Sequence, residues 1–185
     1  MRVERLQTEF DIDLKWTHFP LHPSTPEAGL TLEQLFAGRQ MDIPASKARM
    51  VRLMAEEGLD YGDRTMTYNS RLAQEMAKWA ESEKGTQGIH RALFRAYFVD
   101  GLNLSEISVL VTIAGQLGLS EDEAFEVLRT RSSRESVDAD WTRSQRLGVT
   151  GVPTFRIDKH VAEGAHPYEM LEKFVVHAGG EKRRL

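Results

Sequence analysis

The stretch Leu147-Gly-Val-Thr-Gly-Val-Pro-Thr-Phe155 places a proline inside a segment that otherwise has the composition of a β-strand. Its β-branched and aromatic residues favour a strand. Proline has no N–H to donate to a ladder, so it occupies a sheet edge, a first strand position or a site with a special purpose. Pro153 is therefore a candidate site residue, together with Gly151 and Val152 before it. On the residues alone, the commoner alternative is a trans proline in an edge strand.

Other residue types that could do chemistry are few. The chain has no cysteine, so the sequence as written offers no disulfide, thiolate ligand or cysteine nucleophile. His18 and His22 are four residues apart, but two prolines in the same loop oppose the helical geometry that would bring both imidazoles to one metal. Ser70 lacks a Gly-x-Ser-x-Gly context and is predicted to begin a helix. We therefore predict no catalytic residue and no metal ligand in these positions.

The composition is that of a globular protein and limits the classes of partner. The 185 residues are 41% hydrophobic, enough for one good core or two small lobes. A formal net charge of −4 gives no broad basic surface for nucleic acid. The longest apolar run, residues 107–114, is far shorter than the roughly 20 residues that span a bilayer. We expect a cytoplasmic protein with no nucleic-acid or membrane partner.

Hydrophobic periodicity predicts the elements that must position these residues. Apolar residues at three- and four-residue steps predict a helix over residues 1–10, and the alternation of Ile12, Leu14 and Trp16 predicts a half-buried strand over 11–17. Helical periodicity then continues from 31 to 147. Two strand-like segments follow around an Asp158-Lys159 turn, and Pro167 begins a last helix.

Aromatic residues in the helical block allow two interpretations. Trp79, Phe94, Tyr97 and Phe98 lie at helical spacing, which is typical of a core. The alternative is that they line a cleft, so that the helices wall one side of an apolar groove whose floor is Val152 and Pro153.

The order of elements is helix, strand, helical block, hairpin, helix. A strand before Met1 would complete a βαβ unit and a ββα unit, which together make a thioredoxin fold with a helical insertion. The predicted class is α/β: a thioredoxin-like lobe formed by residues 1–30 and 148–185, an inserted helical domain over 31–147, and a first strand that is apparently missing.

Several segments carry a resemblance to a known family. They are HFPLHP, Asn69-Ser70-Arg-Leu-Ala73, Leu93–Phe98 with Gly101, Gly148–Phe155 and Gly164-Ala165. The chain resembles the DsbA-like thioredoxin family, specifically its FrnE-like branch, which is related to 2-hydroxychromene-2-carboxylate isomerases and kappa-class glutathione transferases. The resemblance implies a cis Val152–Pro153 bond at a groove between the lobes. The Val152 N–H and C=O would then face outward, free to bind an extended peptide or a small thiol.

One departure from the family decides the expected activity. Members carry a Cys-x-x-Cys motif at the N-terminus of the first helix, where the helix dipole stabilises the thiolate. This chain has no cysteine, so we expect it to be inactive in disulfide exchange as written. A glutathione-dependent isomerase or transferase-like protein, and a non-catalytic module that binds peptides or partners, remain alternatives.

Two further expectations concern ligands and assembly. The N-terminus of the last helix, near Ala165 and His166, should offer N–H groups to an anion such as a glutathione carboxylate, so glutathione is a possible cofactor. Without a central first strand, unpaired backbone groups would face a gap in the sheet. We therefore expect either a fragment of a longer protein or self-association, for example as a homodimer.

Overall fold

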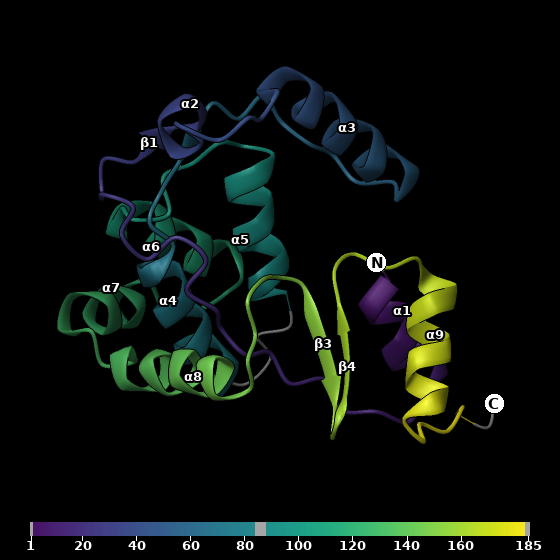
Figure 1. The fold of residues 1–185 in the computed structure, drawn as a ribbon. Coiled ribbons are helices and arrows are strands. Elements are labelled where there is room, and N and C mark those ends of the chain that lie inside the picture. The colour runs from purple at the N-terminus through teal and green to yellow at the C-terminus, as the bar shows by residue number, and fades with distance from the viewer. Residues whose placement is uncertain (1, 84–87, 184–185) are drawn as a thin grey trace. The chain divides into compact units, whose positions relative to one another are not determined.

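A computed structural model describes residues 2–83 and 88–183 (Figure 1). The chain divides into two compact units. Unit 1 comprises Met1–Leu21 and Asp140–Leu185, and unit 2 comprises His22–Ala139. The predicted domain boundaries, after residues 30 and 147, stay a prediction, because compactness alone does not show that either part folds by itself.

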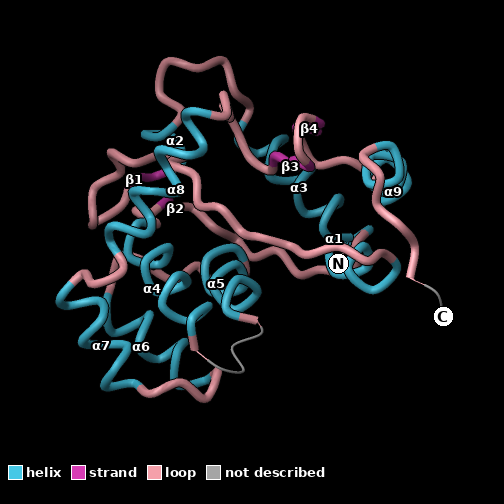
Figure 2. The backbone as a smooth tube through the Cα atoms, turned by 90° about the horizontal axis from the view of Figure 1, so that it is seen from below, coloured by secondary structure: helices cyan, strands magenta, loops and turns pink. Residues whose placement is uncertain are grey.

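Unit 1 joins segments from both ends of the chain. It contains α1 (Arg2–Glu9), β3 (Thr154–Ile157), β4 (His160–Glu163) and α9 (Tyr168–His177). Its strands form the predicted antiparallel hairpin, in which Ile157 pairs with His160 across the two-residue turn. Asp158 in this turn has a φ of 49°, a value that Asp tolerates better than most residues. Both α1 and α9 lie beside the hairpin in the two views of Figures 1 and 2.

The core of unit 1 explains why its two helices pack together. Leu6 and Phe10, on one face of α1 and at its end, are buried against Tyr168, Leu171 and Val175 of α9. Phe155 and Ile157 of β3 pack against this cluster from the inner face of the hairpin. The predicted helix at the N-terminus is therefore present, although Met1 lies outside the described residues.

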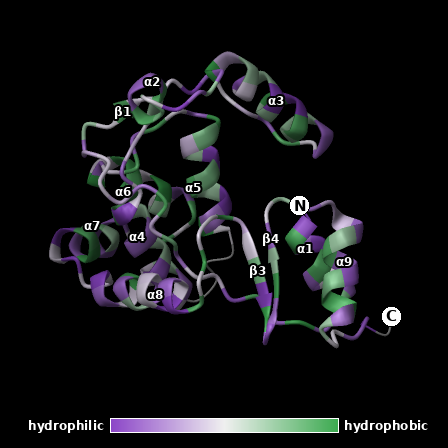
Figure 3. Cartoon of the chain, viewed as in Figure 1, coloured by the Kyte–Doolittle hydropathy of each residue, from purple (hydrophilic) through white to green (hydrophobic). Residues whose placement is uncertain are grey.

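Unit 2 consists mainly of helices. Its elements are β1 (Leu30–Thr31), α2 (Leu32–Leu35), α3 (Ile43–Glu56), β2 (Met66–Thr67), α4 (Arg71–Ser82), α5 (Ile89–Phe98), α6 (Ile107–Gln116) and α7 (Glu121–Thr130). The two short strands pair antiparallel. A further helix, α8 (Arg134–Arg146), is largely hydrophilic and crosses the boundary between the units (Figure 3).

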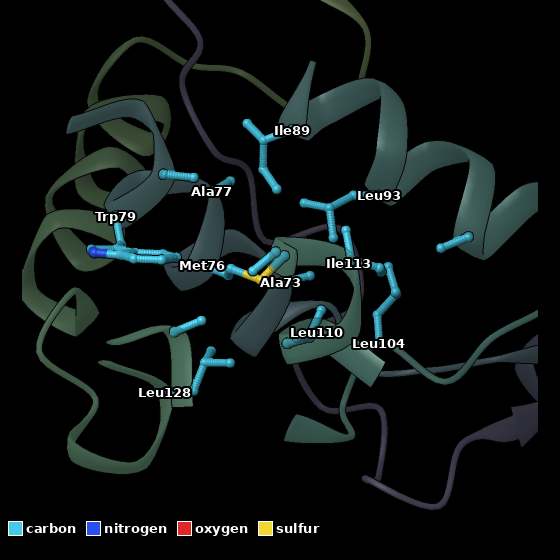
Figure 4. Close-up of a cluster of buried hydrophobic side chains, with 14 residues drawn as sticks. Ala73, Met76, Ala77, Trp79, Ile89, Leu93, Leu104, Leu110, Ile113 and Leu128 are labelled. Atoms are coloured by element: carbon cyan, nitrogen blue, oxygen red, sulfur yellow. The ribbon is translucent and has the colours of Figure 1, made fainter. Parts of the chain in front are cut away.

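The core of unit 2 is a cluster of apolar side chains from α4 to α7 (Figure 4). Met76 of α4 and Leu110 of α6 are fully buried, and Leu128 of α7 is buried in the same cluster. The buried positions on α4 recur at three- and four-residue steps, as the periodicity predicted. No helix in the described part of the chain is both long and apolar enough to cross a membrane.

The strand predicted over residues 11–17 is absent from the structure, so that prediction was wrong. Half-buried Ile12 and Leu14 do alternate with exposed neighbours, which is the pattern that suggested a strand. A strand also requires a hydrogen-bonded partner. Among the described residues, the ladder contact near this segment is an isolated bridge between Phe10 and Lys182, made by bonds from Asp11 N to Glu181 O and from Arg183 N to Glu9 O. The alternation of apolar and polar residues therefore predicted which of these side chains are exposed, but it did not predict strand pairing.

Candidate functional site

The residues around Pro153 form a tight turn that leads into β3. The Val152–Pro153 peptide bond is cis, as the resemblance implied. The Thr154 hydroxyl donates to the Gly151 carbonyl at 2.7 Å, and the Gly164 N–H donates to the Pro153 carbonyl at 2.8 Å. The first hydrogen bond stabilises the turn internally, and the second connects it to Gly164, which follows β4.

Val152 is open to solvent within this turn. The residue is 53% exposed, and Pro153 is exposed beside it. The neighbouring carbonyls of Gly151 and Pro153 already accept hydrogen bonds. In contrast, the main-chain N–H and C=O of Val152 make no hydrogen bond to any residue that the structure describes. Free main-chain groups of this kind can pair with an extended ligand. That Val152 lies in a groove between the two units stays a prediction.

The second predicted position precedes α9. His166 donates its N–H to the Gly164 carbonyl at 3.0 Å, and its own carbonyl accepts from Arg2 Nη1 at 2.7 Å. The helix begins at Tyr168, with Pro167 as an N-cap that cannot satisfy the first N–H groups through a side chain. Among the described residues, the N–H groups of Tyr168 and Glu169 have no acceptor.

These open groups lie two to four residues beyond the predicted pair Ala165 and His166. They are main-chain donors at the positive end of a helix, which favours an anion. The carboxylate of Glu169 lies in the same first turn and opposes a bound anion through its charge. Binding at Ala165 and His166 remains a prediction.

The aromatic residues singled out on the helices divide between the core and the surface. Trp79 is 9% exposed and belongs to the core of unit 2. Phe94 is 51% exposed, so its assignment to the core was wrong. Tyr97 and Phe98 are half-buried and make an edge-to-face contact with 4.8 Å between ring centroids. Phe98 also contacts Phe94, at 6.1 Å.

Unit 2 contains a buried ionic cluster that was not predicted from the sequence. Glu75 of α4 is fully buried. Arg131, just after α7, donates from Nε to Oε2 at 2.6 Å and from Nη2 to Oε1 at 2.7 Å. Arg71 donates from Nε to Oε1 at 2.6 Å and also pairs with Asp138. The four-residue spacing of Arg71 and Glu75 was a local signal for a pair, but nothing local indicated Arg131.

This arrangement keeps the buried carboxylate charged. Burial alone would raise the pKa of Glu75, but the hydrogen bonds from Arg131 and Arg71 outweigh it. The pKa of Glu75 therefore lies below its ordinary value of 4.5. A carboxylate whose oxygens are both engaged by arginines is a structural group, and it is not available as a general base.

Ser70 and Asn69 lie just before α4. Ser70 precedes α4, as predicted, but its side chain makes no capping bond. The Asn69 side chain accepts from Arg71 N at 2.9 Å instead, and it donates to the Thr25 carbonyl at 2.8 Å. Within the described residues, no three His, Asp or Glu side chains gather in a group that could hold a metal ion.

The chain was compared with known proteins. A family model described as a DSBA-like thioredoxin domain matches residues 1–176. The structure is similar to a probable DsbA oxidoreductase of Streptomyces coelicolor, with a TM-score of 0.86, 25% identity, and coverage of 100% of this chain and 84% of that chain. No curated protein matches the chain.

Two further solved structures share the fold. Cytosolic disulfide reductase DsbM from Pseudomonas aeruginosa with GSH has a TM-score of 0.50 and 23% identity, covering 65% of this chain and 63% of that chain. A putative protein disulfide isomerase of Nitrosomonas europaea has a TM-score of 0.56 and 15% identity, covering 74% of each chain. The family model matches far more than half of the chain, at residues 1–176, and the chain belongs to the DSBA-like thioredoxin domain family.

Proposed function

We propose that this chain is a FrnE-like member of the family that holds an extended peptide through the main chain of Val152, without carrying out disulfide exchange itself. The observation that carries the proposal is the exposed Val152, whose N–H and C=O make no hydrogen bond to a described residue. An extended ligand gains affinity from such main-chain groups and specificity from alternate side chains.

The lack of thiol chemistry follows from the composition. Thiol–disulfide exchange begins with attack by a thiolate. The chain contains no cysteine, so it cannot supply one. A binding role needs only the main chain of Val152 and a rigid support. The hydrogen bonds that the Gly151 and Pro153 carbonyls accept provide this support. We place this role in the cytoplasm.

Isothermal titration calorimetry with a cysteine-free extended peptide tests the proposal, with matched substitutions at Gly151. A Cβ added at Gly151 would meet no atom within 4 Å, so the position accepts a side chain. We expect Gly151→Ala to bind like the unmodified chain, whereas Gly151→Trp adds bulk beside Val152 and weakens binding at least about tenfold. Equal affinities for the two variants, or no heat with any extended peptide, would rule out a ligand site at Val152.

Glutathione is a second candidate ligand. The observation that favours it is the pair of open N–H groups at the start of α9, at Tyr168 and Glu169. Glutathione is also a short extended peptide with two carboxylates. Reduced glutathione should then bind the unmodified chain directly in calorimetry, and Glu169→Gln should tighten glutathione by removing a like charge. Peptide binding without any heat from millimolar glutathione would leave the peptide role and discard the glutathione branch.

A further inference from the structure

The hairpin of unit 1 has a free outer edge on β4. The Gly164 N–H bonds to the Pro153 carbonyl, so in the alternating antiparallel ladder the hydrogen-bonded pairs include Phe155 with Ala162. The main-chain groups of Val161 and Glu163 therefore point away from β3. They make no hydrogen bond to any residue described in the structure. Unpaired edges of this kind recruit another strand.

The side chains along this edge are complementary to themselves. Val161 and Glu163 lie on the outer face of the hairpin; Val161 is 46% exposed and Glu163 is exposed. Lys159, the last residue of the turn before β4, and Glu163, the last residue of β4, lie two residues to either side of Val161 and carry opposite charges. When such a strand pairs antiparallel with a copy of itself, each lysine faces a glutamate.

We propose that β4 is the interface of a homodimer, in which the β4 strands of two copies pair antiparallel about a two-fold axis at Val161. Val161 then faces Val161 of the second copy, and Lys159 faces its Glu163, twice per dimer. Shifting the axis to Ala162 would place Glu163 opposite Val161, so charge complementarity selects the first register. The pairing joins two hairpins into one four-stranded sheet.

The helix beside β4 offers a second surface to the same neighbour. A two-fold axis perpendicular to the sheet keeps both copies of α9 on one face. Between β4 and α9 there is a hollow of about 380 Å³. It is lined by Ala162, His166, Met170, Lys173, Phe174 and His177. Met170 is 51% exposed, and the dimer places it next to α9 of the second copy, where it loses contact with water.

Two proline substitutions test which edge of the hairpin forms the dimer. Val161 and Arg156 face each other across the hairpin as a non-hydrogen-bonded pair, so their N–H groups point to opposite edges. Val161→Pro removes a donor from the β4 edge, and Arg156→Pro is the matched change at the β3 edge. Light scattering across a concentration series should show a species of about 42 kDa, twice the 21.0 kDa chain. Val161→Pro should abolish it, and Arg156→Pro should retain it.

A charge exchange tests the register without touching the backbone. Glu163→Lys should raise the dimer dissociation constant by about tenfold, because it faces Lys159 twice per dimer. The double variant Lys159→Glu, Glu163→Lys should restore the dimer. A monomer at every soluble concentration would overturn the proposal. So would a dimer retained in Val161→Pro, or a double variant that stays as weak as the single one.

Discussion

Replacing Arg131 with leucine removes two of the three hydrogen bonds that the buried carboxylate of Glu75 receives. Leucine preserves the Cβ atom, so the left-handed backbone at this position, with φ 58°, is under the same strain before and after the change. The substitution therefore reports on the ion pair and on little else.

The expected loss follows from burial. Removing one partner of a buried ion pair costs about 3–5 kcal/mol, because the remaining charge is left without compensation. Two features of this site place the cost near the lower end of that range. Arg71 still donates to Glu75, and the Arg131 side chain is itself 39% exposed, so water already screens part of the interaction. We expect a loss of about 3 kcal/mol in the free energy of unfolding.

Urea denaturation followed by circular dichroism measures the change, with Arg129→Leu as the control. Arg129 lies on the neighbouring turn of α7 and pairs with Glu126, but both side chains are more than half exposed. The control should leave the denaturation midpoint almost unmoved. A similar, small effect in both variants would refute the reasoning that burial gives the Glu75 pair its strength.

The same pair predicts a pH dependence. Since the folded pKa of Glu75 lies below its ordinary value of 4.5, its contribution to stability is fully present above that pH. The contribution is lost as the pH falls through the folded pKa. The difference between the unmodified chain and Arg131→Leu should therefore be largest at neutral pH and shrink below about pH 4. A gap that stays constant down to pH 2 would contradict the assignment to Glu75.

Three other outcomes follow from the structure. Burial and the hydrogen bond to Glu9 raise the pKa of Tyr168 to about 12. An ultraviolet titration should therefore show a late tyrosine step that Tyr168→Phe removes, and stability should fall as the pH rises from about 10 towards 12. Met76→Ala should lower the free energy of unfolding by about 2–5 kcal/mol, and Phe94→Ala by much less, in parallel urea titrations. The purified chain should show no turnover above background in an insulin-reduction assay, because it supplies no thiolate; turnover by protein of verified mass would contradict this.

Local signals in the sequence predicted the hairpin, the first and last helices and the helical character of residues 31–147. The Asp158-Lys159 turn between two alternating segments fixed the position of β3 and β4, because a two-residue loop determines the register. Pro44 in the first turn of α3, and Gly58 with a φ of 66° after its end, are helix start and stop signals that depend on single residues.

Features that depend on distant residues were not predictable in this way. Ile12 and Leu14 alternate as in a strand, but whether a partner strand lies beside them is a property of the fold. Glu75 is charged and would normally be exposed; its burial depends on Arg131, 56 residues away in the sequence. Phe94 has the spacing of a core residue, yet it is on the exposed side of α5.

The most direct test of the account is a nuclear magnetic resonance titration of the chain with a cysteine-free extended peptide. The central claim is that the exposed main chain of Val152 binds such a ligand without thiol chemistry. The largest amide shifts should then fall on Gly151, Val152 and Thr154, and removal of the peptide should restore the original spectrum. Saturating peptide that leaves these amides unmoved, or that shifts only residues of unit 2, would contradict it.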